Sequence, residues 1–175
     1  MMRWSLPMLV TAILATAWTA LPAAAETLGP ISEETPPAVC DPGWFVVEVA
    51  CSGDYCDNVE IRCARVEGAA LGAALWLPWI SEEGRRISCP GNSLVAGLAC
   101  DGKYCDSLSL YCVEVTNLNA VNCGDTAWVS EEQGRLYLGQ GIVDKAGQQI
   151  AAKGIECRGD YCDDKRFEVC EVYAR

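Results

Sequence analysis

Apolar and polar residues alternate along six stretches of this chain, and alternation with a period of two predicts β-strands. Three of these stretches run into a cysteine and cover residues 44–51, 93–100 and 150–157. The other three lie just beyond the next cysteine and cover residues 57–66, 106–115 and 165–173. The two strands of each pair are separated by one short motif, Cys-x-Gly-x-Tyr-Cys-Asp. The pattern therefore predicts three β-hairpins, each closed by the same kind of turn.

The remainder of the chain adds strands and no helix to this prediction. Further short strands are expected near Trp79-Ile80 and Trp128-Val129, where apolar residues precede a polar cluster. The stretches "EEGRRI" and "DKAGQQIAAK" are too short and too interrupted by glycine to keep a helical period. The predicted fold class is all-β.

The hairpins belong to longer repeats. Four cysteines recur 49 residues later, which relates Cys40, Cys51, Cys56 and Cys63 to Cys89, Cys100, Cys105 and Cys112. The motif "ISEE" at 31–34 returns as "ISEE" at 80–83 and "VSEE" at 129–132. We therefore divide the chain into three tandem units, at about 26–74, 75–123 and 124–175. Three sheet-forming units of this size favour a closed, pseudo-threefold β-prism, with a β-trefoil as the alternative.

The third unit departs from the other two. Eight additional residues separate its "SEE" from Cys157, and it has no counterpart of Cys89. The added segment, "GRLYLGQGIVDKAGQQ" at 134–149, breaks the symmetry, and we hypothesise that it carries binding specificity. One more residue separates Cys162 from Cys170 than separates the equivalent cysteines elsewhere, and Cys123 matches no cysteine of the other units.

The N-terminus has the pattern of a secretory signal peptide. A basic start is followed by an uncharged stretch at 4–25 that ends in alanines, which predicts cleavage before Glu26. Residues 26–175 are then one domain of ordinary size, with no further membrane-spanning stretch. The expected location is the periplasm or the extracellular space.

Charge and composition exclude several functions. The chain has a net charge of −11, so binding to nucleic acid is not expected, because phosphate backbones repel it. It contains no histidine, which excludes histidine-based triads and most catalytic zinc or copper sites. The cysteine spacings are not those of zinc knuckles, so we expect neither a metal nor another cofactor.

All twelve cysteines are expected to form disulfides, because exported proteins fold in an oxidising compartment. The constant spacing of the motif favours three local bridges, Cys51–Cys56, Cys100–Cys105 and Cys157–Cys162. The outer cysteines would then pair as Cys40–Cys63, Cys89–Cys112 and, with a substitute partner, Cys123–Cys170. Spacing alone leaves rival pairings such as Cys56–Cys63 open.

The repeated turn also supplies the candidate ligand-binding residues. The tyrosine and the final aspartate of each motif are Tyr55, Asp57, Tyr104, Asp106, Tyr161 and Asp163. The tyrosines would pack over the neighbouring bridge or stack on a sugar ring. The aspartates would brace the turn through backbone N–H groups, or present carboxylates to calcium or sugar hydroxyls. The central glycines, Gly53, Gly102 and Gly159, are predicted to adopt positive φ.

For the other candidate residues, structural roles are the default expectation. Trp79 and Trp128 are expected to fill the core, whereas Trp44 and Trp76 could serve in the core or in a site. The paired acids Glu33-Glu34, Glu82-Glu83 and Glu131-Glu132 would suit a glycosidase only if they were held at set separations. Adjacent acids in a turn are more often simply solvated.

The segment 79–112, "W-I-S … C-P-G-N-S-L-V-A-G-L … D-S-L-S-L-Y-C", resembles the repeat of the vitelline membrane outer layer proteins. This resemblance implies a three-sheet β-prism in which the opening and closing cysteines of a repeat are bridged, as in the proposed Cys89–Cys112 pair. The family has Asp-Asp-Thr-Ala where this chain has Tyr-Cys-Asp, so a ligand role of that turn does not carry over.

The expected function is that of a non-enzymatic exported module that binds a glycan or cell-envelope material through its repeated loops. The alternatives are a structural or inhibitory protein that binds a protein partner, and, more weakly, a carbohydrate-active enzyme.

Overall fold

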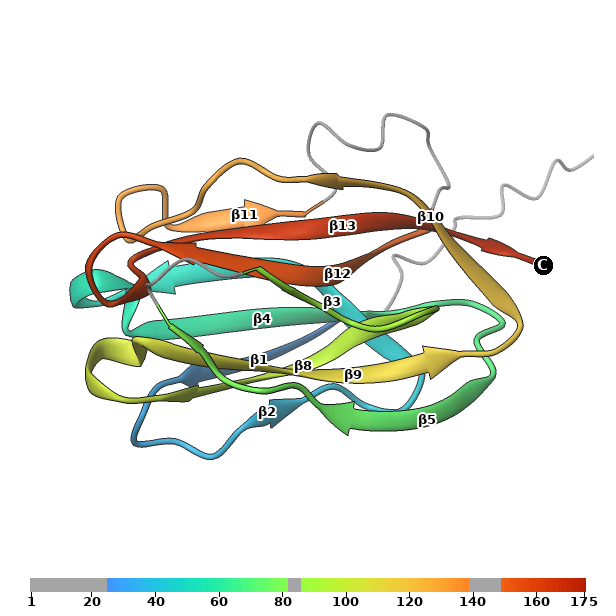
Figure 1. The fold of residues 1–175 in the computed structure, drawn as a ribbon, viewed down its shortest axis with the longest axis horizontal. Coiled ribbons are helices and arrows are strands. Elements are labelled where there is room, and N and C mark those ends of the chain that lie inside the picture. The colour runs from blue at the N-terminus through green and yellow to red at the C-terminus, as the bar shows by residue number, and fades with distance from the viewer. Residues whose placement is uncertain (1–24, 82–85, 139–148) are drawn as a thin grey trace, which may run out of the picture.

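The computed structural model describes residues 25–81, 86–138 and 149–175. These residues form an all-β fold, as predicted, whose only helical segments are three single 3-10 turns. The three hairpins run side by side, and their turns gather at the left end of the molecule in Figure 1. The signal-peptide prediction falls on residues outside the described range, apart from Ala25, where the first strand begins.

The three predicted hairpins form with boundaries within two residues of expectation. The incoming strands are β3 (Trp44–Ser52), β8 (Ser93–Asp101) and β12 (Gln149–Arg158). The outgoing strands are β4 (Asn58–Arg65), β9 (Ser107–Val115) and β13 (Asp164–Ala174). The 3-10 turns between them are η1 (Asp54–Cys56), η2 (Lys103–Cys105) and η3 (Asp160–Cys162).

Each outgoing strand pairs on its other side with an outer strand that the hydrophobic pattern did not predict. The outer strands are β1 (Ala25–Ile31), β5 (Leu71–Trp76) and β10 (Leu118–Asp125). They are mostly exposed, and every residue of β5 is. A strand with little burial lacks the alternation from which a strand is recognised, so these three were missed.

Each incoming strand pairs with a short strand donated by another unit. The short strands are β2 (Ala38–Val39), β7 (Ile87–Ser88) and β11 (Arg135–Tyr137). β2 of the first unit joins β8, β7 of the second joins β12, and β11 of the third returns to β3 of the first. The three sheets are therefore linked in a ring.

The sheets have the same strand order. The first is β1-β4-β3-β11, the second is β5-β9-β8-β2, and the third is β10-β13-β12-β7. The second also carries the predicted short strand at Trp79-Ile80, formed as β6 (Ile80–Ser81), which pairs with β9. The predicted strand at Trp128-Val129 is reduced to a single bridge from Val129 to Lys165. The choice between a β-prism and a β-trefoil stays a prediction.

Each hairpin contains a β-bulge at the same place. The registers skip one residue of the incoming strand, which is Val47, Ala96 or Lys153. The carbonyl of that residue accepts a hydrogen bond from the residue just after the donated short strand, namely Leu138, Cys40 or Cys89. The bulge thus breaks the ladder and turns a carbonyl toward the neighbouring unit.

The inner faces of the three sheets form the main core. It contains ten of the twelve cysteines, all but Cys123 and Cys170, together with Val49, Leu98 and Ile155 of the incoming strands and Ile61, Leu110 and Phe167 of the outgoing strands. The apolar residue before each Ser-Glu-Glu motif is also buried there, at Ile31, Ile80 and Val129. The repeated motif "[IV]SEE" therefore marks a core anchor.

Six disulfides are present, and they are the six predicted pairs. The local bridges are Cys51–Cys56, Cys100–Cys105 and Cys157–Cys162. The longer ones are Cys40–Cys63, Cys89–Cys112 and Cys123–Cys170.

The geometry of the last bridge differs from the expected one. Ala152 pairs with Val169 as Val46 pairs with Cys63, so Val169, not Cys170, occupies the place of Cys63. The hairpin of the third unit therefore contains no inserted residue. Since successive strand residues face opposite sides of a sheet, Cys170 lies on the other face, where it bridges to Cys123 of the outer strand.

Candidate functional site

The three repeated turns meet at one end of the molecule and form a single cluster, which we call the tyrosine tip. It consists of Tyr55, Tyr104 and Tyr161, whose ring centroids lie 5.2 Å apart in every pair. One pair is tilted by 40° and the other two are edge-on, the arrangements that aromatic rings favour. The tyrosines thus pack on one another, and the three predicted sites become one place.

The backbone of each turn is unusual and is the same in all three. The glycines have φ between 73° and 77° with extended ψ, a region open only to glycine, as predicted for Gly53, Gly102 and Gly159. In each turn the tyrosine, which follows two residues after the glycine, and the cysteine next to it also have positive φ, near 57°. Sequence reasoning missed this, because neither residue type favours the left-handed region. The local disulfide and the packing of the rings hold the turn there.

The three aspartates lie directly over the glycines. A Cβ atom built on Gly102 would lie 2.0 Å from Oδ1 of Asp106, and the other two turns give nearly the same distance. Asp163 accepts a hydrogen bond from the backbone N–H of Asp164 at 2.7 Å, while burial raises the pKa of its carboxyl group. Asp57 accepts one from the side-chain amide of Asn58 at 2.6 Å. These contacts fit the bracing role.

A lysine lies beneath the tyrosine tip. Lys165 occupies the position held by Val59 and Leu108 in the other units, and its side chain is fully buried. Its Nζ donates to the carbonyls of Cys162 at 2.6 Å and Cys56 at 3.4 Å, which joins the third turn to the first. Burial lowers the pKa of this amine to about 8.

A second lysine sits above the same tip. The ammonium group of Lys103 lies 4.6 Å from the ring centroid of Tyr104 and 5.6 Å from that of Tyr161. These distances are within the range of cation–π attraction. The side chain itself is exposed.

The outer faces of the three sheets differ, although their topology is the same. On the first sheet the buried Glu48 accepts hydrogen bonds from Arg62 at 2.9 Å and Arg135 at 2.8 Å. Burial acts to raise the pKa of Glu48, but the two guanidinium groups outweigh it, so the pKa is lowered. Arg135 also reaches Glu60, and the outer face is closed by charges of both signs.

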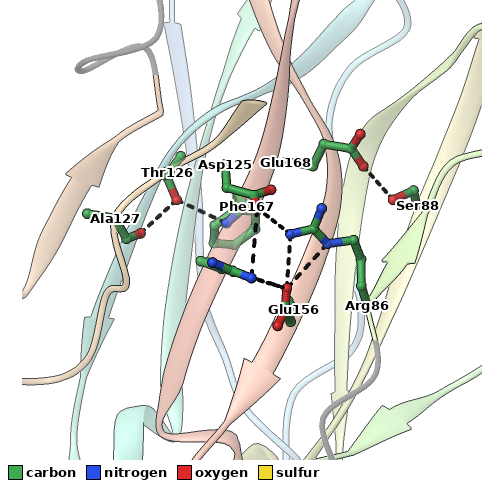
Figure 2. A network of polar contacts seen from close by, with 9 residues as sticks. Arg86, Ser88, Asp125, Thr126, Ala127, Glu156, Phe167 and Glu168 are labelled. Carbon is green, nitrogen blue, oxygen red and sulfur yellow. Dashed lines mark hydrogen bonds and ion pairs between the residues drawn. The ribbon is translucent and has the colours of Figure 1, made fainter. Parts of the chain in front are cut away.

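The third sheet carries a similar network, which Figure 2 shows. Arg86 pairs with Asp125 at 2.5 Å and with Glu156 at 2.9 Å, and Arg166 pairs with the same Glu156 at 2.8 Å. Beside this network the indole of Trp128 contacts two guanidinium groups, 3.9 Å from that of Arg158 and 4.7 Å from that of Arg166. The expectation that Trp128 fills the core was therefore wrong: its ring is half-buried and packs against two arginines.

The second sheet presents aromatic and apolar side chains instead. The ion pairs found among the described residues lie on the other two sheets. Trp79 is 51 % exposed, so the expectation that it fills the core was wrong for this residue too. Trp76 is 39 % exposed, and its ring lies 5.1 Å from that of Tyr111. We call this surface the aromatic face.

The aromatic face includes a surface hollow of about 250 Å³. The hollow is lined by Pro37, Trp76, Leu77, Trp79, Ala99 and Ser109. The hydroxyl of Ser109 donates to the carbonyl of Leu77 at 2.7 Å. The stretch "GAALGAALWLPWI" at 68–80, the most apolar after the N-terminus, supplies β5 and both tryptophans. A run of exposed apolar residues outside the alternating strands was thus the signal in the sequence for this face.

The remaining candidates lie elsewhere. Glu33, Glu34, Glu131 and Glu132 are exposed, and Glu82-Glu83 falls outside the described residues. The segment 134–149 is described only at its ends, where it forms β11 and begins β12. Nowhere in the described ranges is there a helix long and apolar enough to cross a membrane.

No protein-family model, no curated protein and no solved structure matches this chain. The resemblance to the vitelline membrane outer layer proteins stays an expectation from the sequence.

Proposed function

We propose that this protein is an exported, non-enzymatic module that binds glycan through the aromatic face of its second sheet. The observation that carries the proposal is the exposure of Trp76 and Trp79 on one face that lacks the ion pairs of its two sister faces. Contiguous exposed apolar surface on a folded domain usually marks an interaction site. The comparison of the three sheets strengthens that inference, because, among the described residues, the outer faces of the first and third sheets are covered by ion pairs and that of the second is not.

The chemistry of the face favours a sugar. A pyranose ring has an apolar face of C–H groups and a polar edge of hydroxyl groups. Trp76 and Tyr111 are adjacent, and together with Trp79 they offer flat apolar rings for the C–H groups. The hydroxyl group of Tyr111 offers a hydrogen-bonding group beside them. Aromatic rings with few polar groups at their rim are typical of small-ligand sites.

The disulfides support an exported location. Six bridges within one small domain are typical of proteins that work in an oxidising compartment. They tie the three hairpins and one outer strand, so the scaffold under the aromatic face is rigid. A rigid scaffold lowers the entropy lost when a ligand binds.

The test is a glycan array probed with the disulfide-intact protein, followed by titration calorimetry with the glycan that binds. We expect Trp76→Ala and Trp79→Ala each to weaken binding at least ten-fold, with little loss of stability because both rings are exposed. Trp128→Ala, which changes a tryptophan on the third sheet, is the matched control and should bind as the parent protein does.

Two results would contradict the proposal. Glycan binding that survives both tryptophan substitutions would remove the aromatic face from the function. If no glycan binds, but one protein is captured from envelope extract and lost with Trp76→Ala, the face serves a protein partner instead.

A further inference from the structure

The tyrosine tip already holds one cation, and that cation belongs to the chain itself. The Nζ atom of Lys103 lies near the rings of both Tyr104 and Tyr161, at 4.6 and 5.6 Å from their centroids. The faces of aromatic rings are negative, so an ammonium group there is attracted to two rings at once. Lys103 thus shows which chemical group this surface accepts.

The other two turns carry a carboxylate where the second turn carries this lysine. The residue that precedes the tyrosine is Asp54 in the first turn and Asp160 in the third. Because the three turns share one backbone conformation, these side chains leave the turn at the position from which Lys103 leaves it. An ammonium group over either of the remaining ring pairs would therefore come from another molecule and would meet a carboxylate beside the rings.

The charges around the tip favour the same kind of ligand. The final aspartates of the motifs, Asp57, Asp106 and Asp163, add one carboxylate to each turn, beside the glycine of that turn. The basic groups nearby are engaged: Lys165 is buried and bonded to two carbonyls, and Arg158 pairs with Asp164 while lying on Trp128. Carboxylates alone would attract any cation, but the rings select one that is weakly hydrated and has C–H groups to bury.

We propose that the tyrosine tip binds the alkylammonium groups of a cationic partner, at the two ring pairs not covered by Lys103. The ring centroids are only 5.2 Å apart, so the cation lies on the rings and not between them. A single group is therefore bound weakly, with a Kd on the order of millimolar, and two groups on one chain bind more tightly through their higher effective concentration. The site is independent of the aromatic face.

The experiment uses the whole disulfide-intact protein and tetramethylammonium chloride, with potassium chloride at the same ionic strength as the reference. Tyrosine ring resonances are followed by NMR. We expect saturable shifts for the rings of Tyr55 and its two neighbours with tetramethylammonium, and smaller, unsaturable shifts with potassium.

Variants separate the rings from the charge. Tyr55→Leu should weaken binding at least five-fold, because the C–H groups lose a ring but the carboxylates stay, whereas Tyr55→Phe should bind within about two-fold of the parent protein. Lys103→Asp changes only an exposed side chain and should strengthen binding about five-fold, because it opens the third ring pair and supplies a carboxylate. Tyr137→Leu, which removes an exposed tyrosine from the first sheet, should change nothing.

The proposal is overturned if tetramethylammonium shifts the rings no more than potassium does, or if Lys103→Asp leaves the affinity unchanged. Equal binding by Tyr55→Leu and Tyr55→Phe would also overturn it, since the carboxylates would then act without the rings. Loss of glycan binding with retained cation binding would refute only the proposed function.

Discussion

The buried amine of Lys165 makes the stability of the protein depend on pH above neutrality. Its pKa is lowered from 10.5 in an unfolded chain to about 8 in the folded protein, because burial penalises the charged form. Four carboxylates oppose this effect without cancelling it, and they belong to Asp163, Glu131, Asp164 and Asp57. Between pH 8 and pH 10.5 the unfolded chain therefore binds more protons than the folded one, and stability rises with pH.

The size of the effect follows from the shift. Each unit of pKa difference corresponds to about 1.4 kcal/mol, so the full change is about 3 kcal/mol, most of which is reached by pH 10. The burial of Lys153, whose pKa is also lowered, adds to the slope in the same direction. A variant that lacks only Lys165 isolates its share.

The assay compares the parent protein with Lys165→Met by guanidinium unfolding between pH 7 and pH 10 with all disulfides intact. The free energy of unfolding of the parent should rise relative to that of the variant by roughly 2 to 3 kcal/mol over this range. If the difference in stability between the parent protein and Lys165→Met is constant with pH, burial does not lower the pKa of this amine and the reasoning fails.

Three further predictions concern the scaffold. Gly102→Ala should destabilise the protein by about 3 kcal/mol or more in thermal unfolding, whereas Gly43→Ala should cost only about 1 kcal/mol. Both glycines have positive φ, but only Gly102 has an atom within 4 Å of a new Cβ. Equal losses of stability would show that the contact in the turn does not matter. The double variant Leu138→Cys/Val169→Cys should form a seventh disulfide, detectable as a loss of two mass units, and raise stability by about 2–4 kcal/mol. The reason is that Leu138 and Val169 occupy in the third unit the positions that Cys40 and Cys63 occupy in the first. Persistent free thiols would refute that equivalence. Glu48→Gln should cost about 2 kcal/mol of stability at neutral pH, and this loss should shrink as the pH falls below about 4. The lowered pKa of Glu48 means that its carboxylate stabilises the folded protein only while it is ionised. An equal loss at pH 7 and pH 3 would contradict this prediction.

The hairpins and their bridges were predictable, because burial on one face leaves a period of two and the motif repeats three times. The outer strands were not, since β5 is exposed throughout and its residues follow no alternation. The exposure of Trp79 was missed for a related reason: large apolar residues are buried by default, and only the neighbouring sheets reveal which faces are covered.

The contact among the three turns also could not be predicted from the sequence. The motif identifies each turn as a local unit, but the contact of Tyr55 with Tyr104 and Tyr161 depends on how three sheets are arranged around one another. Likewise, counting residues between cysteines suggested an insertion before Cys170, whereas the strand register shows a change of face. Spacing gives the partner of a cysteine more readily than the side of the sheet on which it lies.

The exchange of short strands in a ring has a consequence for how the domain can be assembled or shortened. Each unit completes the sheet of the next, and β11 of the third unit completes the sheet of the first. A chain cut after the second unit would leave β3 with an unpaired edge and expose the core side of both remaining sheets, so two units should aggregate where three fold. The domain is thus a single cooperative whole, unlike an open repeat array that can lose or gain a unit at its end.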